Sequence, residues 1–269
     1  MGTIADMAIP NKGRSVRIAT AQFLARTFIC LLGLGAVVWG GLVFPFFWQQ
    51  APLNRVVSEL LHGHAFKTQT LLDEAQHADA VAQSSFCNPT QLHNAVVLRL
   101  AILDEGIAAG NQTLIDSTYR PLYDASRTAL SCMPADPFVW LTLFWLDAGK
   151  HGFDLDNANY LRLSYALGPN EGWIALSRSR IAFALFARLP TDLANDAIDD
   201  FINLVDTGQL YSETAAIFAS AAPAVQSRIV AQFATAKPIP RRNFARMLYN
   251  RGLDVTIPGV DSRPARPWQ

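Results

Sequence analysis

An uncharged apolar run from Thr27 to Trp48 constrains this chain more than any other feature. Its 22 residues are long enough to cross the hydrocarbon core of a bilayer once as a helix. The segment before the run carries four basic residues and one acidic residue, namely Lys12, Arg14, Arg17, Arg26 and Asp6. Because basic flanks stay on the cytoplasmic side, we predict a cytoplasmic tail over residues 1–26 and an exported chain after Trp48.

A basic segment followed by an apolar run also fits a cleaved secretory signal. Signal cleavage sites have small residues in an A-x-A-like pattern, whereas this run ends in bulky residues from Phe44 to Gln50. We therefore expect an uncleaved transmembrane helix over residues 27–48. The main domain is then expected on the exported side of the membrane.

Two of the three cysteines, Cys87 and Cys132, lie in the exported part, where an oxidising compartment permits a disulfide. Two helical patterns lie between them, from Pro89 to Ala108 and from Leu114 to Leu130, joined by a turn-prone Gly-Asn pair. An antiparallel hairpin folded at that turn would bring the two cysteines together. The sequence therefore predicts a disulfide-stapled hairpin, with two unrelated buried thiols as the alternative.

The rest of the exported chain also has the periodicity of helices. We expect a juxtamembrane helical segment over 49–86 that includes an amphipathic helix ending near Gly63, the stapled hairpin over 87–135, a helical repeat domain over 136–252, and a basic C-terminal tail over 253–269. Start and stop signals within the repeat domain predict helices from Asp136 to Ala148, Leu155 to Leu167, Asn170 to Leu189 and onward from a Thr191 cap, then over 211–220, 223–235 and 241–250. The acids after Thr191 are expected to face water: Asp192, Asp196, Asp199 and Asp200.

The spacing of prolines and helices suggests a repeat. Pro134 and Pro169 are 35 residues apart, and each precedes a helical pattern. This spacing is similar to the tetratricopeptide repeat, whose unit is about 34 residues. Trp140 is expected between the helices, although Phe144 replaces the small residue that the repeat has four positions later. We predict an all-α fold in which stacked antiparallel helix pairs form a degenerate tetratricopeptide-like solenoid after the transmembrane helix.

Two segments, CMPADPFVWLTLFWLDAGKHGF and NYLRLSYALGPNEGWIALSRSRIAFALF, carry a narrower resemblance. They resemble the VpsP-like group, single-pass bacterial inner-membrane proteins of tetratricopeptide-like build found with exopolysaccharide biosynthesis and export systems. The likeness covers about residues 50–255 and lies in Trp140, Trp145, the run at 167–173 and both exported cysteines. The resemblance implies a bacterial inner-membrane location with the main domain in the periplasm. It also implies association with surface-polysaccharide machinery, and it carries over no catalytic residue.

Enzymatic signatures are absent from the sequence: no G-x-S-x-G, H-E-x-x-H, P-loop or G-x-G-x-x-G motif occurs. His62 and His64 form an H-x-H pair without the third ligand and base that a zinc hydrolase needs. Three carboxylate pairs are interpreted as solvated helix faces rather than glycosidase acids, namely Asp104-Glu105, Asp154/Asp156 and Asp199-Asp200. We expect no enzyme, cofactor, metal or nucleic-acid partner, and a divergent glycan hydrolase is the remaining enzymatic alternative.

Large aromatic side chains concentrate between Phe138 and Trp173. Arg162 lies within this segment, and Arg178 and Arg180 lie just after it. Aromatic rings stack on sugars or anchor partner helices, and arginine pairs with carboxylates. Core packing between stacked helices is the preferred interpretation of the rings, and the candidate surface for a partner or glycan is Arg162, Glu171, Trp173, Arg178 and Arg180. The predicted function is a membrane-anchored scaffold or assembly factor of a surface-polysaccharide system that acts through protein contacts. The alternative is a periplasmic module that binds a glycan, such as an acidic polysaccharide.

Overall fold

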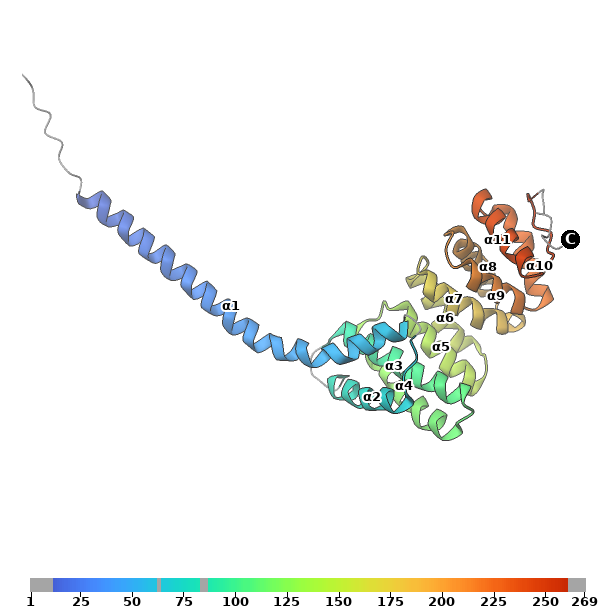
Figure 1. Ribbon diagram of the computed structural model, residues 1–269, viewed down its shortest axis with the longest axis horizontal. Helices are drawn as coiled ribbons and strands as arrows, with labels where there is room; N and C mark the ends of the chain where they lie inside the picture. Colours follow the sequence, from blue (N-terminus) through green and yellow to red (C-terminus); the bar gives the residue numbers. More distant parts are fainter. Residues whose placement is uncertain (1–11, 62–63, 83–86, 261–269) are drawn as a thin grey trace, which may run out of the picture. The chain divides into compact units, whose positions relative to one another are not determined.

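The computed structural model describes residues 12–61, 64–82 and 87–260, and every regular element among them is a helix (Figure 1). The chain divides into two compact units, with the boundary after Ser58. The predicted all-α class is therefore confirmed for the part of the chain that the structure describes.

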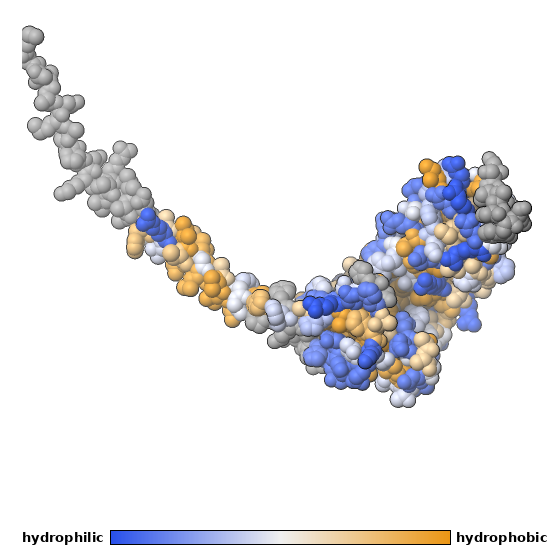
Figure 2. Space-filling model, viewed as in Figure 1, coloured by the Kyte–Doolittle hydropathy of each residue, from blue (hydrophilic) through white to orange (hydrophobic). Residues whose placement is uncertain are grey.

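Helix α1, Lys12–Leu61, forms the first unit up to Ser58. Its stretch Ala25–Phe44 has a mean hydropathy of 2.2 and is long and apolar enough to cross a membrane. Figure 2 shows the apolar surface along this helix. A cleaved signal sequence meets the same criteria of length and composition. These criteria therefore identify a long apolar helix, whereas its cleavage is a separate property. The helix is longer than expected: it begins within the predicted cytoplasmic tail and continues past Trp48 without a break.

The second unit stacks helices against their neighbours in sequence. Helix α3 packs against α2 and α4, α5 packs against α4 and α6, and α7 packs against α8. The C-terminal part is more bundle-like, because α8 also contacts α6, α9, α10 and α11. The helices are α2 Thr68–Ala82, α3 Pro89–Ala108, α4 Gln112–Cys132, α5 Pro137–His151, α6 Leu155–Leu167, α7 Gly172–Ala184, η1 Phe186–Arg188, α8 Thr191–Asp206, α9 Tyr211–Ser220, α10 Pro223–Gln232, η2 Phe233–Thr235 and α11 Pro238–Asn250. The predicted stacked helix pairs are confirmed. Gly63 and most of the predicted C-terminal tail, residues 261–269, lie outside the described residues.

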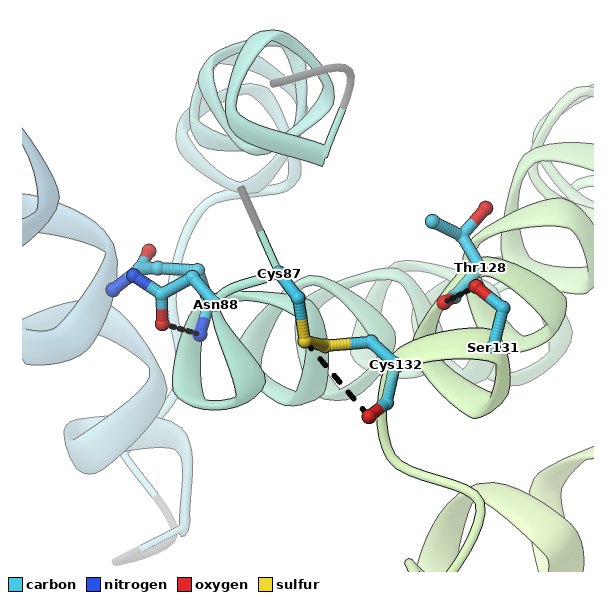
Figure 3. The surroundings of a disulfide bond; sticks show 6 residues. Cys87, Asn88, Thr128, Ser131 and Cys132 are labelled. Atoms are coloured by element: carbon cyan, nitrogen blue, oxygen red, sulfur yellow. Dashed lines mark hydrogen bonds between the residues drawn. A yellow bond between two sulfur atoms is a disulfide. The ribbon is translucent and has the colours of Figure 1, made fainter. Parts of the chain in front are cut away.

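The stapled hairpin forms as predicted. A disulfide joins Cys87 and Cys132, whose Cα atoms are 5.7 Å apart, at the start of α3 and the end of α4 (Figure 3). The turn between the helices uses Gly110 at a φ of 62°, which favours glycine. Close packing of the two helices also needs Gly106, since a Cβ atom there would lie 3.2 Å from Ile115 Cγ1.

Helix α5 begins at its predicted cap but ends later than predicted. Asp136 Oδ1 accepts hydrogen bonds from the backbone N–H groups of Phe138 and Val139, at 3.0 and 3.1 Å. The predicted stop at Gly149 is wrong, because a single glycine is tolerated within a helix at a cost of about 1 kcal/mol. The helix instead ends at Gly152, whose φ of 84° terminates it.

Other predicted helix boundaries are also wrong. Helix α7 begins after Glu171 rather than Asn170, and it ends at Ala184, before the short η1 turn. Helix α11 begins at Pro238 rather than Arg241. Helix α8 has Pro190 at its cap position, and Thr191 is already helical and makes no capping bond. Neither α7 nor α8 starts with a side-chain cap, so a sequence rule that searches for polar caps misplaces both.

Trp140 lies between α5 and α6 as expected, but it is only partly buried. Its ring stacks on Tyr160 of α6, and its Nε1–H donates to the carbonyl of Pro134 at 2.8 Å. Phe144, one turn later, is fully buried and meets the ring of Phe153 edge-on. The bulky residue that replaces the small residue of the repeat is therefore the more deeply buried of the two rings.

Reduction of the disulfide is expected to lower the free energy of unfolding by about 4 kcal/mol, because Cys87 and Cys132 close a loop of 45 residues. Urea unfolding of the detergent-solubilised full-length protein, with and without a phosphine reductant, measures this difference. Cys30→Ser is the control, since Cys30 is a free thiol and its loss should leave the difference unchanged. Identical unfolding midpoints in the two conditions would contradict the stapling role.

Candidate functional site

A buried ion pair lies at the centre of the region where binding residues were predicted. Arg178 on α7 has no exposed surface, and Asp200 on α8 is 6% exposed. Arg178 Nε donates to Asp200 Oδ2 at 3.0 Å, and its Nη2 donates to Oδ1 at 2.9 Å. This two-point geometry matches the planar guanidinium to the carboxylate and fixes the two helices relative to each other.

The other donors of Arg178 bind the end of a third helix. Its Nη1 donates to the carbonyl of Ser164 at 2.7 Å and its Nη2 to the carbonyl of Gly168 at 2.9 Å. The Ser164 carbonyl lies in the last turn of α6 and also accepts from the backbone N–H of Gly168, whereas the Gly168 carbonyl lies at the C-terminal cap, beyond the helix's own hydrogen bonds. The guanidinium therefore joins α6, α7 and α8.

The prediction that Arg178 lies on the surface is wrong, and so is the prediction that Asp200 faces water. Asp200 lies on the buried face of α8, with the fully or almost fully buried residues Leu193, Ala197, Phe201 and Leu204. This spacing of i, i+4, i+7, i+8 and i+11 is visible in the sequence and could have identified Asp200 as an interior carboxylate.

Tyr165 on α6 completes this buried cluster. Its ring lies 4.8 Å from Arg178 Cζ, and its hydroxyl is buried without a hydrogen-bond partner. Burial, and secondarily the charge of Asp200, raises the pKa of Tyr165, so the phenol stays neutral. Burial also raises the pKa of Asp200, and Arg178 offsets only part of that rise.

An open pocket of about 290 Å³ adjoins the ion pair between α6 and α8. Arg162 stands at this pocket but is already paired, since its Nε donates to Asp192 Oδ2 at 2.8 Å. Asp196 has no ion-pair partner among the described residues, and partial burial followed by the charges of Asp192 and Asp199 raises its pKa. The pocket is thus rich in carboxylates, and its lining consists of Arg162, Tyr165, Ala166, Pro169, Asp196, Asp199, Asp200 and Asn203.

The remaining predicted surface residues do not converge on this pocket's lining. Trp173 is 42% exposed, and its ring centre lies 5.0 Å from that of Phe138 and 6.4 Å from that of His93. Glu171 and Arg180 are exposed, and the Glu171 side chain makes no capping bond. The five residues predicted as one surface are therefore divided among a pocket rim, the protein interior and the solvent-exposed side.

Sequence reasoning missed a second pocket, of about 490 Å³, formed by α3, α4 and α5. Trp145 and Tyr119 line it, together with aliphatic side chains and Lys150. This pocket forms only where three helices meet. The positions of Tyr119 and Trp145 within their own helices therefore do not predict it.

The described residues contain no group of three or more His, Cys, Asp or Glu side chains that could hold a metal ion. His62 of the H-x-H pair lies outside the described residues. His64 contacts the carboxylate of Glu59 through its Nδ1.

Comparison with protein-family models, with curated proteins and with solved structures finds no significant match to this chain.

Arg178→Ala is expected to lower the free energy of unfolding by about 3–5 kcal/mol, because it leaves Asp200 buried without a counter-charge. Arg180→Ala removes an exposed charge two residues away and should change it by at most about 0.5 kcal/mol. The double variant Arg178→Met with Asp200→Leu should recover part of the loss, since no charge is then buried. Urea unfolding followed by far-UV circular dichroism gives all three values, and similar small effects for Arg178→Ala and Arg180→Ala would refute the buried pair.

Proposed function

We propose that this protein is a membrane-anchored scaffold or assembly factor that holds a protein partner on its stacked helices. The observation that carries the proposal is the charge of the open pocket between α6 and α8. Asp196 and Asp199 line it, whereas Arg178 points into the interior. A carboxylate-rich pocket suits a basic side chain of a partner protein, and like-charge repulsion disfavours an acidic polysaccharide there.

Features of the anchor support a cytoplasmic N-terminus and a periplasmic main domain. The apolar stretch Ala25–Phe44 is long enough to span the inner membrane, and basic residues precede it. The Cys87–Cys132 disulfide is the kind of bond that persists in the bacterial periplasm and is rare in the cytosol.

The proposed link to a surface-polysaccharide system rests on the resemblance to the VpsP-like group. Part of that resemblance, the run at 167–173, has a packing role in this structure. A Cβ atom at Gly168 would lie 2.6 Å from Pro137 Cγ, and the carbonyl of Gly168 accepts a hydrogen bond from Arg178. The run therefore has a structural role in this chain, and membership of the group is proposed together with the assembly.

A glycan-binding module is the second candidate function. The exposed ring of Trp173 favours it, because an indole face is a suitable platform for a sugar ring. One side of that ring is occupied by Phe138, and the neighbouring acid, Glu171, would repel an acidic glycan. The scaffold proposal is therefore preferred.

A reporter enzyme that is active only in the periplasm, fused after Gln269, is expected to be active in cells that express the full-length chain. The physical reason is the basic flank before the apolar stretch of α1, which holds the N-terminus in the cytoplasm. A reporter active only in the cytoplasm is the matched control and should be silent at the same position. Activity of the cytoplasmic reporter together with silence of the periplasmic reporter would refute the proposed topology.

Asp196→Lys is expected to reduce the recovery of a co-purifying protein partner by roughly tenfold or more, because it reverses the charge of the pocket. The measurement is quantitative mass spectrometry after cross-linking and affinity capture of the full-length protein from membranes. Glu105→Lys, the same charge change at an exposed position on α3, should leave recovery unchanged. Equal recovery with Asp196→Lys would refute the binding role of this pocket, and recovery of glycan without protein would favour the glycan-binding function.

A further inference from the structure

The pocket formed by α3, α4 and α5 has an aliphatic floor. Leu103 and Leu146 line it and are 2% and 1% exposed, while Ile107 lines it and is 49% exposed. A floor of this kind offers no hydrogen-bonding groups to sugar hydroxyls, whose burial without partners is costly. It suits an apolar side chain, and an exposed isoleucine beside it adds apolar surface that an occupant would bury.

Trp145 lines the same pocket, and its indole can still form a hydrogen bond and a ring contact. Among the described residues its ring has no aromatic neighbour, and its indole N–H has no acceptor. Trp140, on the same helix, contrasts with it, because that indole donates to Pro134 and stacks on Tyr160. A tryptophan with a free N–H in a pocket is the kind of residue that anchors a partner at an interface.

One cation of the pocket, Lys150, has no carboxylate partner among the described residues. The Lys150 ammonium lies 4.8 Å from the centre of the Tyr119 ring, and no described carboxylate lies within ion-pair distance of it. Asp116 already accepts a hydrogen bond from Gln112, at 2.8 Å. Arg120 pairs with Asp124, a residue outside the pocket lining. The lining thus holds two cations, Lys150 and Arg120, against one acid, Asp116. Among the described residues, the Trp145 N–H has no acceptor and the Lys150 ammonium has no carboxylate partner.

We propose that this pocket binds an acidic amphipathic segment of a partner protein. An apolar side chain of the segment fills the aliphatic floor, a carboxylate pairs with Lys150, and an oxygen of the segment accepts the Trp145 N–H. Charge complementarity selects an acidic segment here, whereas the pocket between α6 and α8 selects a basic one. The inference rests on the proposed function only in that the occupant is a protein, and it concerns a different surface.

The test uses the full-length protein in lipid nanodiscs and a displayed library of random peptides as the probe. The expected result is enrichment of peptides with apolar residues at helical spacing and an Asp or Glu beside them. Lys150→Glu should weaken their binding by roughly tenfold or more, and exchanging the peptide's acid for Lys should restore it. Trp145→Phe, which keeps a ring and removes the N–H, should weaken it less. Arg180→Glu, the same kind of charge reversal at an exposed position, should leave it unchanged.

Three outcomes would overturn the proposal: enriched peptides without acidic residues, binding that survives Lys150→Glu, or no enrichment together with binding of oligogalacturonate that Trp145→Phe abolishes. The last outcome would assign the pocket to an acidic glycan. Asp196→Lys distinguishes this inference from the proposed function, because it should leave peptide binding at the α3–α5 pocket unchanged. A negative result for partner capture at the α6–α8 pocket therefore leaves the peptide-binding result at the α3–α5 pocket interpretable, and the converse also holds.

Discussion

The buried ion pair of Arg178 and Asp200 is the interaction on which the arrangement of α6, α7 and α8 depends. A guanidinium that is removed from water needs a counter-charge and acceptors, since an uncompensated buried charge costs several kcal/mol. Asp200 supplies the charge, and the carbonyls of Ser164 and Gly168 supply the acceptors. Because these groups come from three helices, all of the bonds form together only in one relative placement of those helices.

The same pair determines the polarity of the neighbouring surface. With Arg178 turned inward, the cation that lines the pocket between α6 and α8 is Arg162, which is already bound to Asp192. The carboxylates of Asp196 and Asp199 then dominate that pocket. The lining of the pocket between α3, α4 and α5 differs, because it holds Lys150 and Arg120 against one acid, Asp116. The occupants proposed for the two pockets are therefore of opposite charge.

Local rules were sufficient where a feature depends on nearby residues. The apolar run predicts a membrane-length helix because hydrophobic length is a property of one segment. The disulfide between Cys87 and Cys132 followed from the symmetry of a hairpin about its turn, and Asp136 followed from the pairing of a capping side chain with a helix-starting proline. The predicted helix boundaries were wrong at Gly149 and Thr191. Helix α5 continues past Gly149, and helix α8 begins without a capping side chain.

The sequence by itself determined the all-α class, the apolar helix, the stapled hairpin and the order of most helices, because periodicity and capping act over one or two turns. Only the tertiary structure decided that Arg178 is interior, that Phe144 rather than Trp140 is fully buried, and that Trp145 lines a pocket. A long polar side chain is placed by partners on other helices, and a pocket exists only where several helices meet. Neither property is carried by any single stretch of the chain.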